Sequence, residues 1–283
     1  MDILDGKLVL DVLSVPSVTG HEVRMREYLV DYAGKDSAID VMTDKKGNVY
    51  FTKGKLDDGE YYPCLTAHMD TVQSWQLPYV GKNMRLDVLK NSLNPDRTIV
   101  YCDEGGIGAD DKCGIAIILC MFKRLEKVKA CFFVEEETGC HGSEVADMKW
   151  LSDVGYCISF DSPMFNRACW KSGGVKLFDG AFYKERLDEI CTRHGMVNFR
   201  EEPYTDIKNL RRKTGTACVV LGTGYINQHT SIEVCVLEDM EKSAALGLEL
   251  IGSLGTCKYT IHEGTLYEEV EDNKFLKTLA GRK

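Results

Sequence analysis

Residues 108–139 read GADDKCGIAIILCMFKRLEKVKACFFVEEETG and carry the clearest signal of the fold class. Within 112–126, apolar side chains recur at helical spacing, at Ile115, Ile118, Leu119 and Phe122. The apolar run KACFFV (129–134) follows at once and has the length and composition of a buried strand. A helix that leads directly into a buried strand is typical of α/β proteins with a parallel sheet.

Strand-like and helix-like segments alternate along the rest of the chain. Thr19 and Glu22 match a capping box, which predicts a helix with Thr19 as its N-cap. Segments 38–43 and 49–54 predict a hairpin in which Gly47 supplies the turn. Further strands are expected at 62–68, 156–160, 196–201 and 216–222, and further helices at 181–193, 206–213 and 238–253. The alternation predicts an α/β fold: a mixed, mostly parallel central sheet flanked by helices on both faces.

The domain organisation is predicted to be simple. Length alone allows one large α/β domain or two small ones. We find no internal repeat and no low-complexity linker, so we expect a single domain over residues 1–283. The stretch 78–106 is rich in Gly, Asn, Pro and Asp, and we expect a surface excursion or hairpin there.

Charge and cysteine usage narrow the expected partners and compartment. The formal net charge is −9 and the pI is about 5.3, which argues against nucleic acid or an anionic membrane as a partner. The N-terminus lacks a basic region followed by a long apolar run, and no stretch approaches the length needed to span a bilayer. The twelve cysteines form no CxxC pair and fall mostly in apolar runs, which is typical of reduced, buried thiols. We therefore expect a cytoplasmic protein.

Five segments end in side chains that bind divalent metals, each where a strand is expected to give way to a loop. In chain order they are CLTAHMD with His68 and Asp70, GADDKCG with Asp110 and Asp111, VEEETG with Glu136 and Glu137, ISFD with Asp161, and NQHTSIE with His229. The set mixes imidazoles and carboxylates and holds no thiolate, which suits a hydrolytic zinc or similar centre. One glutamate is left over, and an open metal site needs such a residue as general base.

Each segment taken alone also has an ordinary structural interpretation. A single histidine at a strand end is more often structural than a ligand, and two acids at a helix N-terminus can simply favour the helix dipole. Glycines before Asp110 could form a phosphate loop, but no Gly-Lys-Ser/Thr follows and two acids would repel a phosphate. The run Glu135–Glu137 could be solvated, although three like charges after a buried strand repel one another and a cation would relieve this.

Together, the five segments resemble the di-zinc exopeptidase superfamily, which includes peptidase T, glutamate carboxypeptidases, acetylornithine deacetylase and the zinc aminopeptidases. The order His-x-Asp, Asp-Asp-Lys-x-Gly, Glu-Glu-x-Gly, Asp, His is that superfamily's signature, and here it extends across residues 14–233 together with SVPSVTGHE and TDKKGNV. The stretch 195–233 is particularly similar to the segment before the last histidine in the aminopeptidase branch.

The resemblance implies a role for each position. Asp110 would bridge two divalent metals; His68 and Asp161 would complete one site, and Glu137 and His229 the other. Glu136 would be the general base, and Asp70 would orient His68. Asp110 is preferred to Asp111 because it lies two residues before Lys112, as in the family's Asp-x-Lys-x-Gly frame. Zinc is the expected metal, and cobalt or manganese would fit the same ligands.

The chain departs from the family where relatives insert a lid domain. In peptidase T and the carboxypeptidases the lid lies between the third acid and the last histidine; here only 68 residues separate Asp161 from His229, and they have the pattern of a core. In tetrahedral aminopeptidases it lies between the first histidine and the bridging Asp; here 42 residues separate His68 from Asp110, enough for a hairpin. We therefore expect a bare catalytic domain, with 78–106 in place of a lid.

The resemblance leaves three functions open. The leading hypothesis is hydrolysis of a terminal peptide bond, of the aminopeptidase type, with a small peptide as substrate. A deacylase acting on N-acyl amino acids would use the same chemistry. A catalytically silent metal- or peptide-binding protein would keep the fold alone. The missing lid favours a monomer or a simple homodimer.

Overall fold

The computed structural model describes residues 3–261 apart from 80–81, 91–93, 95 and 197, together with 274–275 and 277–278. The elements, in chain order, are α1 (Gly6–Leu13), α2 (Val23–Ala33), β1 (Ile39–Thr43), β2 (Val49–Lys53), β3 (Tyr62–His68), η1 (Ser74–Tyr79), β4 (Asp87–Lys90), β5 (Thr98–Tyr101), α3 (Ala109–Phe122), β6 (Val128–Phe133), α4 (His141–Glu144), η2 (Trp150–Asp153), β7 (Val154–Ser162), β8 (Arg167–Ser172), β9 (Val175–Lys176), α5 (Gly180–Phe182), η3 (Tyr183–Leu187), α6 (Asp188–Arg193), β10 (Asn198–Glu202), α7 (Ile207–Thr214), β11 (Cys218–Gly222), β12 (Tyr225–Ile226), β13 (Val234–Val236) and α8 (Leu237–Leu254).

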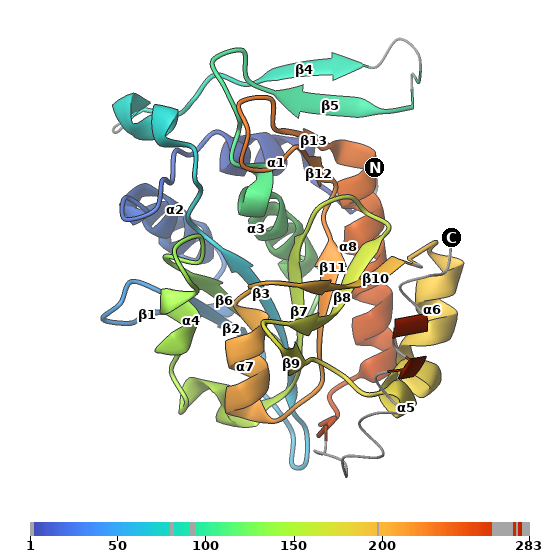
Figure 1. Cartoon of the computed structure of the whole chain (residues 1–283). Helices are drawn as coiled ribbons and strands as arrows, with labels where there is room; N and C mark the ends of the chain where they lie inside the picture. Colours follow the sequence, from blue (N-terminus) through green and yellow to red (C-terminus); the bar gives the residue numbers. More distant parts are fainter. Residues whose placement is uncertain are drawn as a thin grey trace.

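The central sheet is mixed, and its middle strands are parallel (Figure 1). Within the described residues it holds nine strands: β1-β2-β6-β3-β7-β11-β8-β10 in spatial order, with β9 paired to β8. β3 runs parallel to both β6 and β7, and β7 runs parallel to β11. Antiparallel pairs join β2 to β6 and β8 to β11. Every residue of β3 and β6 is buried, as expected for strands covered on both faces.

Helices cover the sheet from both sides. On one face α1, α3 and α8 pack together, and α3 lies against β3 and β7. On the other face α7 packs on β7 and β11 and contacts α4 (Figure 1). All residues of α3 are buried, including the apolar stripe that the sequence identifies. The predicted fold class is therefore confirmed. No helix in the described part of the chain is long and apolar enough to cross a membrane.

A second, smaller sheet stands at one end of the molecule, at the top of Figure 1. It has the order β12-β13-β5-β4, so the hairpin β4–β5 pairs with the segment that follows β11. The hairpin belongs to the stretch 78–106, of which 80–81, 91–93 and 95 lie outside the described residues. That this stretch takes the place of a lid stays a prediction.

Of two local predictions near the N-terminus, the structure confirms the hairpin and contradicts the capping box. The hairpin over 38–54 is confirmed, since β1 and β2 pair antiparallel and Gly47 has a φ of +106°. The capping box is wrong. The helix α2 begins at Val23, three residues later than a Thr19 cap requires. The Thr19 hydroxyl instead donates to Asp70 at 2.9 Å, and Glu22 accepts the N–H of Gly20 at 2.9 Å. Tertiary partners thus compete successfully with the local cap.

Gly114 allows α3 to lie directly on β7. A Cβ atom at this position would stand 2.2 Å from the carbonyl oxygen of Phe160 and 2.5 Å from a carboxylate oxygen of Asp111. Neither group can move freely, because one is strand backbone and the other is buried. The helix can therefore approach the sheet this closely only without a side chain at residue 114.

We expect Gly114→Ala to lower the free energy of unfolding by about 2 kcal/mol, because the added methyl group overpacks the contact between α3 and β7. Gly252→Ala is the matched control, since Gly252 is an exposed residue of α8 with open space around its Cα. It should raise stability by about 0.5–1 kcal/mol through helix propensity. Urea denaturation measures both; equal effects at the two positions would contradict the close packing described for Gly114.

Candidate metal centre

Three neighbouring parallel strands deliver the first side chains of the site. His68 is the last residue of β3, Glu135–Glu137 begin two residues after the end of β6, and Asp161 is the next-to-last residue of β7. Because β6, β3 and β7 are adjacent and parallel, their carboxyl ends meet at one edge of the sheet. Asp110 reaches the same place from the start of α3, and His229 from the loop between β12 and β13.

The carboxylate of Asp110 lies between two imidazoles. Its Oδ1 is 3.2 Å from Nε2 of His68, and its Oδ2 is 3.2 Å from Nε2 of His229. On one side, Oδ1 of Asp161 lies 3.6 Å from Nε2 of His68. On the other, Oε1 of Glu137 lies 3.0 Å from Nε2 of His229. One acid thus connects two pairs, each made of one imidazole and one further carboxylate.

Electrostatics in this cluster are those of a site that attracts cations. Burial raises the pKa of Asp161 to about 7, although His68 opposes the shift. Burial likewise raises the pKa of Glu137. Contacts with Asp110 and then Glu137 raise the pKa of His229 to about 10. Clustered acids at such a depth repel one another, and bound divalent cations would offset that repulsion.

The donor set fits divalent metals. Among the described residues, two groups bring three ligand atoms within 4.8 Å of one another: His68, Asp110 and Glu137, and His68, Asp111 and Asp161. The imidazole and carboxylate donors match the preferences of zinc, cobalt or manganese. His68, Asp110, Asp161, Glu137 and His229 would hold such ions.

Asp111 lies beside the cluster but is already engaged. Its Oδ1 accepts the N–H of Gly114 at 3.1 Å, and its Oδ2 accepts the N–H of His68 at 3.3 Å. Both carboxylate oxygens of Asp110, in contrast, face histidine nitrogens. The geometry therefore favours Asp110 over its neighbour as the shared acid.

Asp70 orients His68 chiefly through its backbone. Nδ1 of His68 lies 2.9 Å from the carbonyl oxygen of Asp70 and 3.5 Å from its carboxylate. A proton on Nδ1 can be donated to that carbonyl, which leaves Nε2 free to bind a metal. The carboxylate itself accepts the N–H groups of Glu136 and Glu137 at 2.9 and 3.1 Å. Asp70 thereby connects the end of β3 to the glutamate pair, a role that the resemblance did not suggest.

The three consecutive glutamates separate into two environments. Glu135 has a φ of +52° and turns outward, where its carboxylate pairs with Lys46 at 2.6 Å. Glu136 is buried, and burial raises its pKa well above the ordinary value. It belongs to neither imidazole pair, and its carboxylate accepts a hydrogen bond from the thiol of Cys140 at 3.3 Å. Glu136 is thus an acid beside the cluster, as a general base should be.

Sequence reasoning missed two buried acids next to the centre. Glu233 accepts the N–H groups of Gly108 and Asp110 at 2.6 and 3.2 Å and the amide of Gln73 at 3.2 Å, so it fixes the turn before α3. Asp206, at the start of α7, is 2% exposed, and neither carboxylate oxygen has a hydrogen-bond partner among the described residues. Glu233 ends the NQHTSIE segment but received no role there, and Asp206 lies outside the five segments, so only the folded chain reveals that both acids stand beside the centre.

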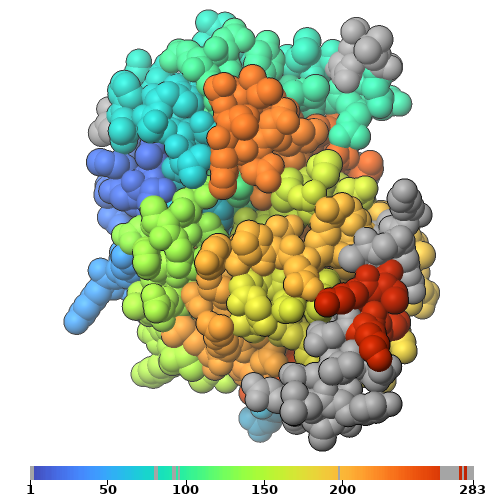
Figure 2. Space-filling model, viewed as in Figure 1, coloured from blue at the N-terminus to red at the C-terminus, as the bar shows by residue number. Residues whose placement is uncertain are grey.

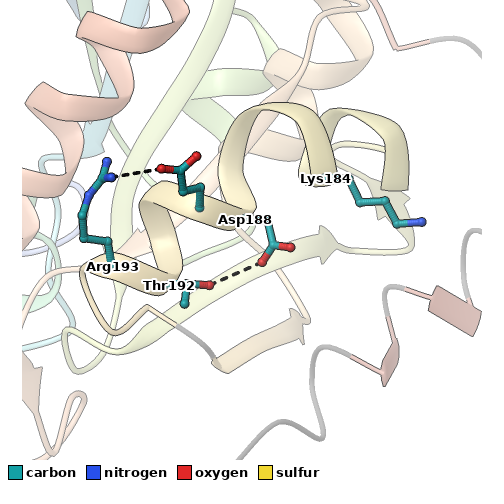
Figure 3. Close-up of a pocket in the computed structure, with 5 residues that line it drawn as sticks. Lys184, Asp188, Thr192 and Arg193 are labelled. Carbon is teal, nitrogen blue, oxygen red and sulfur yellow. Dashed lines mark hydrogen bonds and ion pairs between the residues drawn. The ribbon is translucent and has the colours of Figure 1, made fainter.

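A separate hollow of about 510 Å³ lies away from these strand ends. Lys184, Asp188, Glu189, Thr192 and Arg193 line it. Figure 3 shows Lys184 on η3 and Asp188, Thr192 and Arg193 on the helix α6 that follows. Several are paired within that surface: Thr192 contacts Asp188 at 3.4 Å, and Arg193 contacts Glu189 at 3.3 Å. No residue of the five motif segments lines this hollow. In the space-filling view of Figure 2, the orange segment that precedes α8 lies beside the cyan and green segments of the smaller sheet, at the top of the molecule.

Solved peptidase structures resemble this chain. Aminopeptidase PepT from Bacillus cereus is 16% identical, with a TM-score of 0.70 over 89% of this chain and 99% of that one. A tripeptidase from Staphylococcus aureus is 15% identical, with a TM-score of 0.66 over 88% and 98% of the two chains. The TET1 peptidase of Pyrococcus horikoshii, which can assemble into a tetrahedron or a large octahedral shell, is 15% identical, with a TM-score of 0.63 over 87% and 98%.

Neither a family model nor a curated protein sequence matches the chain. At identities of 15 to 16%, structural likeness establishes the fold alone. The likeness nevertheless extends over most of both chains. It agrees with the order of the five motif segments in the sequence, whose side chains meet at one edge of the sheet. The chain therefore has the fold of the zinc aminopeptidases, as the sequence resemblance predicts.

Proposed function

We propose that this protein is a metal-dependent hydrolase that cleaves a terminal peptide bond, as aminopeptidases do. The observation that carries the proposal is the Asp110 carboxylate between two imidazoles, with a buried glutamate beside them that belongs to neither pair. The peptidases of the same fold support the choice of a peptide as substrate.

Each residue of the cluster has a role in this proposal. Two divalent cations, when bound, lower the pKa of a water molecule and polarise the substrate carbonyl. His68 and Asp161 would hold one ion, Glu137 and His229 would hold the other, and Asp110 would serve both. The backbone carbonyl of Asp70 keeps the proton of His68 on Nδ1, so that Nε2 stays available.

Glu136 moves the proton. Its carboxylate removes a proton from the attacking water and then delivers this proton to the nitrogen of the departing amine. One group can perform both transfers because the first leaves it protonated. Burial favours this role, since it keeps bulk water from competing for the proton.

Glu136→Gln should lower kcat by about 10²–10⁴-fold, because the amide cannot accept the proton, while the metal content stays at the wild-type level. Glu135→Gln is the matched control, since the Glu135 carboxylate turns away from the cluster and, among the described residues, pairs with Lys46. Its kcat should stay within about twofold of wild type, because removal of an exposed ion pair costs little. An active Glu136→Gln enzyme would rule out the assigned base.

Asp110→Ala should abolish binding of both ions, because the shared carboxylate serves each of them. Elemental analysis after dialysis against zinc should find two equivalents in the wild-type chain and fewer than one in the variant. Asp103→Ala removes an exposed acid from the preceding turn and should retain both. Two tightly bound ions in Asp110→Ala would refute the bridging role.

A substrate panel separates the proposed reaction from its nearest alternative. With zinc-loaded protein, aminoacyl p-nitroanilides should be cleaved with kcat/KM at least tenfold above that for N-acetyl amino acids. The opposite ranking would identify a deacylase. No turnover of any amide, at full metal content, would identify a silent binding protein.

A further inference from the structure

Cys140 is a buried residue in the tight turn that follows the glutamate pair. Its N–H and that of Gly139 both donate to the carbonyl oxygen of Glu136, at 2.8 and 2.9 Å. The backbone at Cys140 is left-handed, with a φ of +61°. This turn returns the thiol to the side chain of Glu136, and the Cys140 Sγ lies 3.3 Å from Glu136 Oε1.

The thiol is the donor in this contact. Cys140 is fully buried, and burial raises the pKa of its thiol, so sulfur keeps its proton. A thiol is a weak donor, but a carboxylate is a strong acceptor. Within the described residues, no other hydrogen bond to the Glu136 carboxylate is found, so without the thiol its orientation would depend on packing alone.

The turn that carries Cys140 is itself fixed from the opposite side. The carbonyl oxygen of Cys140 accepts the hydroxyl of Ser143 at 3.1 Å and the side-chain amide of Asn209 at 3.4 Å. The same amide donates to the Ser143 hydroxyl at 2.9 Å. Asn209 belongs to α7, which packs on β7 and β11. These contacts connect the turn that carries the thiol to the central sheet, and Asp161 lies on the same sheet.

We propose that Cys140 is a positioning residue whose thiol holds the Glu136 carboxylate in the orientation needed for proton transfer. The inference rests on the proposed function, because it assigns Glu136 the role of base. Cys140 is fully buried and contacts Glu136, so we expect it to influence the chemical step without contributing to substrate binding.

Two substitutions at this one position test the proposal. Cys140→Ala removes the donor, and Cys140→Ser retains one on a side chain of similar size. With zinc-loaded protein and an aminoacyl p-nitroanilide, Cys140→Ala should lower kcat about tenfold at unchanged KM, the effect of losing one hydrogen bond to a charged acceptor. Cys140→Ser should restore kcat to within about threefold of wild type. Both variants should keep wild-type metal content.

Cys191→Ala controls for loss of a buried sulfur, since Cys191 is a core residue of α6 away from the centre. It should leave kcat unchanged. If Cys140→Ala matches Cys191→Ala while Glu136→Gln is inactive, the positioning role is wrong and the proposed function stands. If Glu136→Gln is fully active, both proposals are wrong.

Crystal structures of the two Cys140 variants provide a readout that needs no activity. The Glu136 carboxylate should keep its place in Cys140→Ser and leave it in Cys140→Ala. An undisturbed Glu136 side chain in Cys140→Ala would overturn the inference, whatever reaction the protein catalyses.

Discussion

The buried carboxylate of Asp70 is the interaction on which the organisation of the site depends. It receives two backbone N–H groups from the segment after β6 and the hydroxyl of Thr19 from the N-terminal turn. Its own backbone carbonyl accepts from His68. Burial raises the pKa of Asp70, but His68 and the surrounding donors lower it overall, so the group stays ionised. One charge therefore aligns three segments that are distant in the sequence.

The arrangement concentrates negative charge where a protein ordinarily avoids it. Asp110, Asp161 and Glu137 each lie 3.0 to 3.6 Å from at least one of the two imidazoles. Glu136 is buried beside them, and burial opposes the ionised state of all four acids. A buried charge is tolerated when it is paired or coordinates a metal. The surrounding fold is rigid enough to maintain such a cluster, because β3, β6 and α3 are buried throughout. The stability of the core thus allows the carboxylates at the strand ends to repel one another. A bound cation would relieve this repulsion, which favours cation binding.

The elements that the sequence predicts best are those with a strong local signal. The stripe in α3, the hairpin over β1 and β2 and the long helix α8 follow from periodicity and turn residues, and the structure confirms them. The capping box at Thr19 fails because its hydroxyl finds a better acceptor in Asp70, 51 residues away. A local rule identifies a nearby hydrogen-bond partner for a polar group, but the folded chain can offer that group a partner from a distant segment, as Asp70 does for Thr19.

The sequence by itself determined the order of the motifs, the residue types that they supply and the strand ends at which they occur, because these follow from composition and spacing along the chain. Only the tertiary structure decided which oxygens of Asp110 face which imidazole, that Glu135 turns to solvent while Glu136 does not, and that Cys140, Glu233 and Asp206 stand beside the centre. The physical reason is that orientation depends on contacts between segments far apart in the chain. Those contacts form only in the folded chain, where adjacent parallel strands bring their carboxyl ends to one edge of the sheet.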